Sequence, residues 1–132
     1  VLAQAALETG WGQKILGHKD DNPSFNLFNI KASNKQWSGS KIVKNALEVI
    51  DGSVKKMKSS FRSYEGFKES IEDYFQFITQ GRYKSASQNS QSEGEYIDGI
   101  AKAGYATDPQ YAEKIKAITK RIQGYLYGGS RL

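Results

Sequence analysis

The dipeptide Asp51-Gly52 separates two runs of strand-forming residues, and this feature restricts the possible folds more than any other in the chain. The strand formers before it are Ile42, Val43, Leu47, Val49 and Ile50. Asp-Gly is typical of two-residue turns in β-hairpins, so we predict a hairpin over 41–61. Two strands are too few to be stable alone, so the hairpin is expected to pack on, or project from, a larger body.

Helical spacing on both sides of the hairpin predicts that body. A helix is predicted within 1–15, and Gly10 and Gly12 indicate that it ends soon after Glu8. A polar, turn-rich loop is expected over 17–24. A second helix is predicted over 64–80. Its inward face is expected to consist of Phe67, Ile71, Tyr74, Phe75 and Ile78.

Two more helices are predicted in the last third of the chain. Ser92 and Glu95 form a capping-box pattern that begins a helix through residue 103. Asp108-Pro109 places a capping residue before a proline, which predicts a helix from there to about residue 125. Its inward residues are expected to be Ile115, Ile118 and Ile122. A flexible tail is expected over 128–132, and the fold class is α+β, predominantly helical.

The length of 132 residues fits a single domain, 1–132. Helical spacing of apolar residues begins at Leu2, as if the sequence starts inside a helix, so we expect this domain to be a piece of a longer protein. The sequence contains no cysteine, which excludes disulfides and cysteine-ligated metal sites. Its net charge of +5 favours anionic partners. However, apart from Lys55, Lys56 and Lys58 the basic residues are dispersed, and a solvated surface is the simpler interpretation.

Glu8 is the first candidate for chemistry. At the C-terminal end of a helix the dipole disfavours an anion, and the neighbouring Leu7 and Trp11 limit solvation, so both effects raise a carboxyl pKa. Such a carboxyl can keep its proton until it protonates a leaving group. An indole three residues further on offers a surface for a sugar ring. The alternative is that Glu8 is a surface glutamate and Trp11 a core residue.

Other candidates lie further along the chain. Glu48 is the one acid in the first strand of a lysine-rich hairpin, and is either a second carboxylate across a cleft or a cross-strand partner of Lys56 or Lys58. Asp73 with Tyr74 is either a functional pair or a helix-surface acid beside a core tyrosine. The lone histidine, His18, is interpreted as a loop residue.

Tyr105, Asp108 and Tyr111 cluster at a predicted helix start. Asp108 is explained by capping. Tyr105 follows a glycine in a loop, where its hydroxyl is more available than in a core. The sequence shows no phosphate-binding loop and no dinucleotide-binding pattern.

Several segments resemble one family in the same order along the chain. The stretch 2–12 reads LAQAALETGWG, 26–31 reads NLFNIK, 61–64 reads FRSY, 73–74 reads DY, and 103–112 reads AGYATDPQYA. These segments are similar to those of the bacterial β-N-acetylglucosaminidases of glycoside hydrolase family 73. Asn29 is a departure, because the family pattern N-x-F-G-x-K has glycine at that position.

The resemblance implies a lysozyme-like fold, in which a helical lobe and a small β-hairpin lobe flank a groove. It implies that Glu8 is the catalytic acid and that Glu48 and Tyr105 assist. Glu48 is expected across the groove from Glu8, with the carboxyls at or beyond the separation of an inverting pair. Substrate contacts are expected from Trp11, Asn26, Asp73, Tyr74 and Tyr111.

The resulting hypothesis is hydrolysis of the β-1,4 bond after N-acetylglucosamine in peptidoglycan, with no metal or organic cofactor. The partner is then the peptidoglycan glycan strand rather than nucleic acid or the membrane interior. We expect a monomer, exported to the periplasm, cell wall or medium. The alternatives are a muramidase or lytic transglycosylase on the same fold, a wall-binding module without activity, and a nucleic-acid-binding protein.

Overall fold

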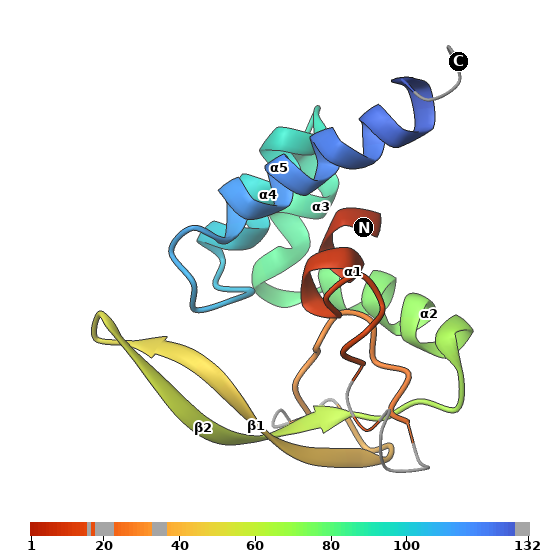
Figure 1. Ribbon diagram of the computed structural model, residues 1–132, viewed down its shortest axis with the longest axis vertical. Coiled ribbons are helices and arrows are strands. Elements are labelled where there is room, and N and C mark those ends of the chain that lie inside the picture. Colours follow the sequence, from red (N-terminus) through yellow and green to blue (C-terminus); the bar gives the residue numbers. More distant parts are fainter. Residues whose placement is uncertain (16, 18–22, 33–36, 129–132) are drawn as a thin grey trace.

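The computed structural model describes residues 1–15, 17, 23–32 and 37–128. The helices and strands follow the order α1 (Leu2–Glu8), β1 (Lys41–Ile50), β2 (Ser53–Arg62), α2 (Phe67–Ile78), η1 (Gly81–Tyr83), α3 (Lys84–Asn89), α4 (Glu93–Lys102), α5 (Tyr111–Gln123) and η2 (Gly124–Gly128). The helices form one body and the hairpin projects along one side of it (Figure 1). The predicted class, predominantly helical α+β, is confirmed.

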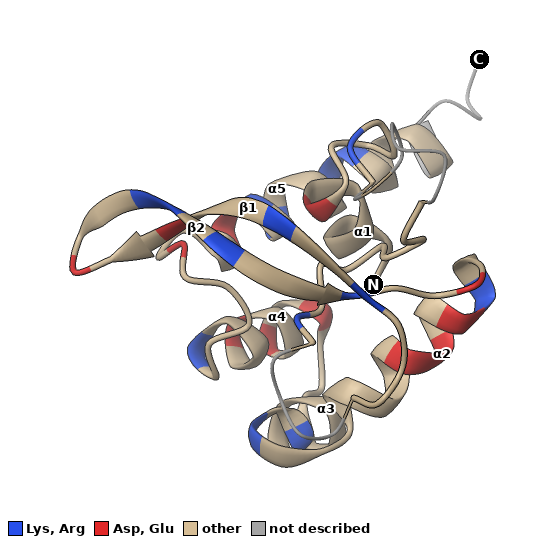
Figure 2. Cartoon of the chain, turned by 90° about the horizontal axis from the view of Figure 1, so that it is seen from below, with Lys and Arg blue, Asp and Glu red and all other residues tan. Residues whose placement is uncertain are grey.

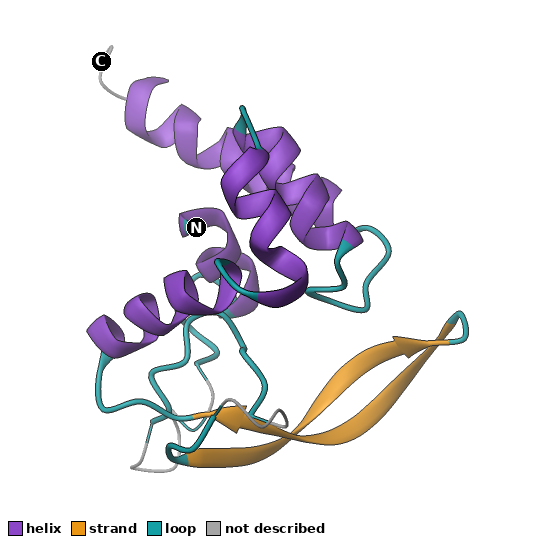
Figure 3. Ribbon diagram, turned by 180° about the vertical axis from the view of Figure 1, so that it is seen from behind, coloured by secondary structure: helices purple, strands orange, loops and turns teal. Residues whose placement is uncertain are grey.

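The hairpin forms where the sequence predicts it. β1 and β2 pair antiparallel from Lys41–Arg62 to Ile50–Ser53, and the turn residues Asp51 and Gly52 have φ angles of 52° and 79°. Two positive φ angles in a two-residue turn match the twist of antiparallel strands. Figure 3 shows the long hairpin beside the helices, with its turn extending away from them. It is anchored at its open end, where Arg62 N–H donates to the Ile30 carbonyl, and again near the turn, where Val49 N–H donates to Thr107 Oγ1.

The core lies within the helical body and takes in the segment before the hairpin. Phe28 and Tyr74 stack with ring centroids 4.2 Å apart, and both are almost fully buried. The other buried members of this core are Ala3, Ile30, Ile78, Tyr83, Ile97, Ile100, Tyr111 and Ile115. Because Phe28 and Ile30 belong to this core, the segment that carries them is held firmly against the helices.

The capping box is confirmed with one change, because Ser92 accepts from Glu95 N–H while the Glu95 carboxylate accepts from Gln91 N–H. The predicted start of the last helix is wrong by a few residues. The Asp108 side chain accepts from Gln110 N–H, which makes a turn, and α5 begins only at Tyr111. Ile115, Ile118 and Ile122 pack inward as expected.

The predicted inward face of α2 is too wide. Tyr74 and Ile78 are buried, but Phe67, Ile71 and Phe75 are 40–49% exposed. No helix or strand was predicted from the sequence between 81 and 89, where η1 and α3 lie. Gly128 belongs to η2 rather than to a tail, and 129–132 lie outside the described residues, as do His18 and most of the expected loop over 17–24.

Charge is spread over several elements. Figure 2 shows Asp and Glu along α2, whereas Lys and Arg occur on both strands of the hairpin and on several helices. Within the described part of the chain, no helix is both long enough and apolar enough to cross a membrane.

Candidate active site

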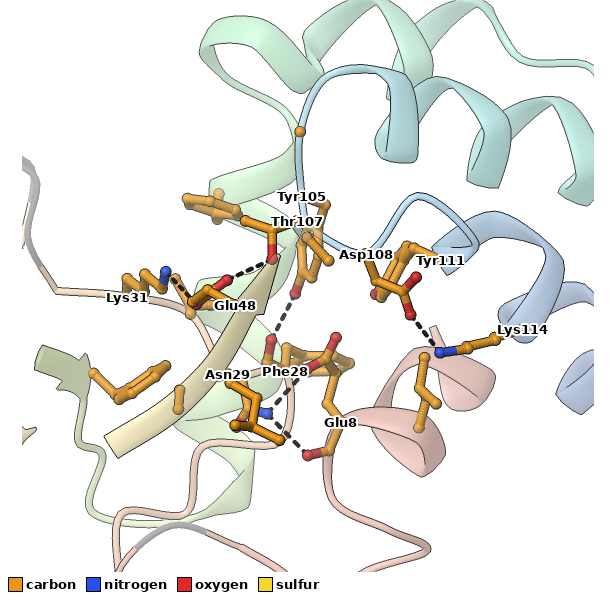
Figure 4. A pocket seen from close by; sticks show the side chains of 18 of the residues that line it. Glu8, Phe28, Asn29, Lys31, Glu48, Tyr105, Thr107, Asp108, Tyr111 and Lys114 are labelled. Carbon is orange, nitrogen blue, oxygen red and sulfur yellow. Dashed lines mark hydrogen bonds and ion pairs between the residues drawn. The ribbon is translucent and has the colours of Figure 1, made fainter. Parts of the chain in front are cut away.

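A pocket of about 460 Å³ is bounded by the end of α1, the segment 28–31, β1, the loop 104–108 and the start of α5. Figure 4 shows side chains from these segments directed toward a common space. Its acidic, basic and tyrosine side chains are Glu8, Lys31, Glu48, Arg82, Tyr83, Tyr105, Asp108, Tyr111 and Lys114. Elements from both ends of the chain therefore supply ionisable groups to one site.

Glu8 is the last residue of α1. The helix ends because Gly10, Trp11 and Gly12 all have positive φ, at 56°, 59° and 87°, and left-handed residues terminate helices. The expected end of the helix soon after Glu8 is thus confirmed. The carboxyl lies at the helix C-terminus, where the helix dipole disfavours a negative charge.

Burial raises the pKa of Glu8 from its ordinary value of 4.5 to about 7. Hydrogen bonds from Asn29 and Tyr111 favour the ionised form and offset part of this rise, while the charge of Glu48 adds to it. A carboxyl with this pKa stays partly protonated at neutral pH. It can therefore donate a proton to a leaving group, as a general acid must.

Asn29 makes two hydrogen bonds to Glu8. Its Nδ2 donates to both the backbone oxygen and Oε2 of Glu8, at 2.9 Å each. Its Oδ1 is buried and, within the described part of the chain, has no hydrogen-bond partner. Asn29 has a φ of 50°, a left-handed conformation that asparagine tolerates better than most residues.

Glu48 projects from β1 into the same pocket. Its carboxylate accepts from Lys31 Nζ at 2.7 Å and from Thr107 Oγ1 at 2.6 Å. Partial burial pushes the pKa of Glu48 upward, but these hydrogen bonds and the charge of Lys31 outweigh it, so the net effect is a lowered pKa. Its ion-pair partner is Lys31 rather than Lys56 or Lys58, and its cross-strand neighbour is Lys55.

Two tyrosines form an aromatic wall of the pocket. Tyr105 and Tyr111 stack with ring centroids 5.7 Å apart and an interplanar angle of 25°. The Tyr105 hydroxyl donates to the Phe28 carbonyl at 2.9 Å, and the Tyr111 hydroxyl accepts from Gln4 at 3.2 Å. Burial raises the pKa of both hydroxyls, so they stay protonated across the neutral range.

The structure places Tyr74 and Asn26 in the interior instead of on the groove. Each has 0% of its surface exposed. The Tyr74 hydroxyl bonds to Gln4 and Tyr96. The Asn26 side chain donates to the carbonyls of Ile30 and Arg62, which fixes the segment before the hairpin. Both side chains thus satisfy buried polar groups and neither lines the pocket, and the substrate contact expected of them stays a prediction.

Asp73 also lies away from Glu8. It accepts from Arg62 Nη1 at 2.8 Å and from the Tyr64 hydroxyl at 2.5 Å. It lines a separate depression of about 300 Å³ with Trp37, Tyr64 and α2 side chains. The pair Asp73-Tyr74 thus splits, with one member in the core and the other in an ion pair that joins β2 to α2.

Trp11 is not among the residues that line the pocket. It is 45% exposed and packs against the C-terminal end of the chain, with Tyr125 at 6.4 Å between ring centroids and Arg121 above its ring at 5.0 Å. A spacing of three residues would place Trp11 on the same helical face as Glu8. The positive φ of Trp11 takes it out of the helix, so the two side chains do not share a face. Trp11, Tyr74 and Tyr105 therefore do not form one surface.

The sequence did not identify Asn29, Lys31 or Thr107 as site residues. Asn29 and Lys31 lie in the NLFNIK segment, where the exchange of glycine for Asn29 was the only available signal. Thr107 lies in the segment 103–112 and also accepts from Val49 N–H at 3.0 Å, so it joins the hairpin to the loop before α5. Within the described ranges, no three acidic, histidine or cysteine side chains are grouped to hold a metal ion.

Comparison with known proteins identifies the family of the chain. The family model described as mannosyl-glycoprotein endo-beta-N-acetylglucosaminidase matches residues 1–124. The peptidoglycan hydrolase FlgJ of Vibrio parahaemolyticus is 44% identical over 93% of this chain and 40% of the relative. The exo-glucosaminidase LytG of Bacillus subtilis is 34% identical over 91% of this chain and 42% of the relative. The chain thus spans about two fifths of the length of these relatives.

Solved structures match as well. A peptidoglycan hydrolase mutant from Sphingomonas sp. A1 has a TM-score of 0.79 and 33% identity, over 92% of this chain and 82% of that one. The C-terminally truncated glycoside hydrolase domain of Salmonella typhimurium FlgJ has a TM-score of 0.69 and 34% identity, over 93% and 81%. The resemblance found in the sequence is thereby confirmed: the chain belongs to the glucosaminidase family, glycoside hydrolase family 73, and is a glycoside hydrolase.

Proposed function

We propose that this chain is the catalytic domain of a peptidoglycan hydrolase that cleaves the β-1,4 bond after N-acetylglucosamine, with Glu8 as general acid. One observation carries the proposal. Glu8, with its pKa raised to about 7, shares a pocket with Glu48, whose pKa is lowered. Two carboxyls whose surroundings separate their pKa values are suited to acid and base roles in one reaction.

In the proposed reaction the Glu8 carboxyl gives its proton to the oxygen that bridges two sugars. The bond from that oxygen to the anomeric carbon breaks, and positive charge develops on the sugar. Water then attacks the anomeric carbon, and Glu48 as base accepts one of its protons. Alternatively, the substrate's own 2-acetamido group attacks first with help from Tyr105, and water opens the resulting ring.

The choice of peptidoglycan rests on the relatives. FlgJ is named a peptidoglycan hydrolase and LytG an exo-glucosaminidase. The pocket between the hairpin and the helical body fits a lysozyme-like groove, and its tyrosine wall offers an apolar face and polar edges to sugar rings. Such a substrate places the working domain outside the cytoplasm, in the periplasm or cell wall.

The test is product analysis on purified peptidoglycan, in which new reducing ends are reduced with borohydride and identified by mass spectrometry. We expect N-acetylglucosaminitol from the wild type, almost no product from Glu8→Gln, and normal product from the exposed-site control Glu113→Gln. N-acetylmuramitol would mean a muramidase, and 1,6-anhydro ends a lytic transglycosylase. Binding without any product would mean a wall-binding module.

A further inference from the structure

We propose that Asn29 is a positioning residue that holds the Glu8 carboxyl in one orientation for proton transfer. The inference rests on the proposed role of Glu8 as the acid. It goes beyond that role, because the family pattern has glycine where this chain has Asn29, and glycine has no side chain to offer. Figure 4 shows the contact, with two dashed lines from Asn29 to Glu8.

The first argument is the geometry of the contact. One nitrogen, Asn29 Nδ2, donates to the Glu8 backbone oxygen and to the Glu8 Oε2, each at 2.9 Å. The side chain of the acid is thereby tied to its own backbone through a third group. The bond to Oε2 restricts how the carboxyl can turn relative to the backbone of Glu8. An acid must be held within hydrogen-bond reach of the oxygen that it protonates.

The orientation of the amide is fixed as well. A backbone carbonyl oxygen only accepts hydrogen bonds, so the Glu8 carbonyl requires the NH₂ end of Asn29 to face it. The reversed amide would bring two acceptor oxygens together. Asn29 therefore presents a donor to the Glu8 carboxyl whether that carboxyl is protonated or ionised.

The second argument is the other end of the same amide. Asn29 Oδ1 is buried and has no hydrogen-bond partner among the residues that the structure describes. A buried acceptor without a partner opposes folding, so an asparagine present only to stabilise the fold is expected to satisfy both ends of its amide. Here one end is left unsatisfied while the other makes both of its contacts to the proposed acid.

The third argument is the backbone. Asn29 has a φ of 50°, in the left-handed region that glycine adopts freely and asparagine tolerates. The backbone thus suits glycine as well as asparagine, so the side chain can be removed without forcing a new turn. Compared with glycine at this position, Asn29 adds a side-chain amide.

The expected consequence follows from the change in charge during the reaction. When Glu8 gives up its proton, Oε2 becomes part of an anion, and a hydrogen bond to an anion is stronger than one to a neutral group. Asn29 therefore stabilises the acid most in the state that proton transfer produces. The same bond lowers the pKa of Glu8 relative to its value without Asn29.

The experiment compares Asn29→Gly and Asn29→Asp with wild type and with the matched control Asn89→Gly, whose asparagine is exposed in the last turn of α3. Three quantities are measured: kcat and KM on soluble glycan strands, the pH dependence of kcat/KM, and the pKa of Glu8 from carbon-13 NMR of its labelled carboxyl. The NMR titration does not depend on activity.

For Asn29→Gly we expect kcat to fall roughly tenfold with KM nearly unchanged, a fraction of the roughly 10²- to 10⁴-fold that a positioned acid supplies. The Glu8 pKa and the basic limb of the pH profile should both move to higher pH. Asn29→Asp should move them further, because it replaces a donor with a carboxylate. Asn89→Gly should change none of these.

Wild-type kcat and an unchanged Glu8 titration in Asn29→Gly would overturn the proposal. Lower activity with an unchanged pH profile and titration would also overturn it, because that pattern means a purely structural role. If Glu8→Gln is active, the proposed function fails for a separate reason, while the NMR titration still reports whether Asn29 acts on Glu8.

Discussion

Glu8 and Glu48 line the same pocket, and their surroundings shift the pKa values of their carboxyls in opposite directions. Burial raises that of Glu8 to about 7. Glu48 is less buried, and its bonds to Lys31 and Thr107 keep it ionised. At neutral pH the pocket therefore combines a proton donor with a carboxylate, without any other charged group having to change state.

The first prediction concerns the pH dependence of hydrolysis. Glu8 must be protonated, so kcat/KM should fall as pH rises through about 7. If Glu48 must be ionised, activity should fall on the acid side only below its ordinary value of 4.5, because its pKa is lowered. The expected profile is a bell with a broad maximum between these limits. Activity that keeps rising to pH 9 would contradict the assignment of Glu8 as the acid.

The second prediction concerns stability. The pKa of Glu8 is about 7 in the folded state and ordinarily 4.5, so its contribution is fully present below 4.5 and is lost as pH rises through 7. The difference corresponds to at most roughly 3 kcal/mol. Glu8→Gln cannot ionise and escapes this loss. Urea unfolding should show the variant gaining stability relative to wild type from pH 4 to pH 8.

A constant stability difference between Glu8→Gln and wild type at the two pH values would contradict this prediction. The comparison across pH matters, since any change in packing caused by the amide is the same at both. Glu113→Gln serves as the control, because its side chain is exposed on α5 and should follow the wild type at each pH.

The elements that sequence predicts well depend on local signals. The hairpin turn needs only Asp51 and Gly52, and the end of α1 needs only the glycines that follow it. The buried face of α2 is different, because spacing identifies a face but not how much of it the neighbouring elements cover. Phe67 and Phe75 satisfy the helical period and are still nearly half exposed.

The candidate site could likewise be predicted only in part from the sequence. The family resemblance points to Glu8, Glu48, Tyr105 and Tyr111, and all four line one pocket. Hydrogen-bond partners distant in the chain leave no local trace, and Thr107 bonds to a residue 59 positions away. For the same reason the sequence could not show that Asp73 pairs with Arg62.

The third prediction tests that pairing. Asp73 and Arg62 have side chains 14% and 4% exposed, and removing the charge of one partner in a buried pair is strongly destabilising. Asp73→Asn should lower the free energy of unfolding by about 3 kcal/mol, with kcat per folded molecule within about twofold of wild type. The control is Asp98→Asn, whose exposed ion pair with Lys116 should be worth less than about 1 kcal/mol.

Calorimetry and activity measured on the same samples separate the two roles of Asp73. A stable Asp73→Asn variant with little activity would favour the substrate role that the family resemblance implies. An unstable variant with normal activity per folded molecule supports the structural role.

The fourth prediction concerns Glu48. Retaining pairs of carboxyls lie about 5–5.5 Å apart and inverting pairs about 6.5–9.5 Å, and we expect Glu8 and Glu48 to act at the longer separation through a water molecule. Glu48→Gln should slow hydrolysis roughly 10- to 100-fold, less than Glu8→Gln does, because water remains a weak nucleophile without a base. Mass spectrometry of the reacting enzyme should find no sugar attached to Glu48.

The neighbours of Glu48 provide the control for that substitution. Glutamine also loses the ion pair with Lys31, so the effect of a displaced hairpin must be separated from the loss of the base. Thr107→Val removes another hairpin contact and keeps the Glu48 carboxylate. We expect Thr107→Val to retain most activity and to move the acid limb of the pH profile to higher pH, since the Thr107 hydroxyl helps to lower the pKa of Glu48.

Wild-type activity in Glu48→Gln, with retained configuration at the anomeric carbon by NMR, would favour the acetamido-assisted route. Tyr105→Phe would then be the informative variant, because it removes the hydroxyl that now donates to the Phe28 carbonyl and keeps the ring stacked on Tyr111.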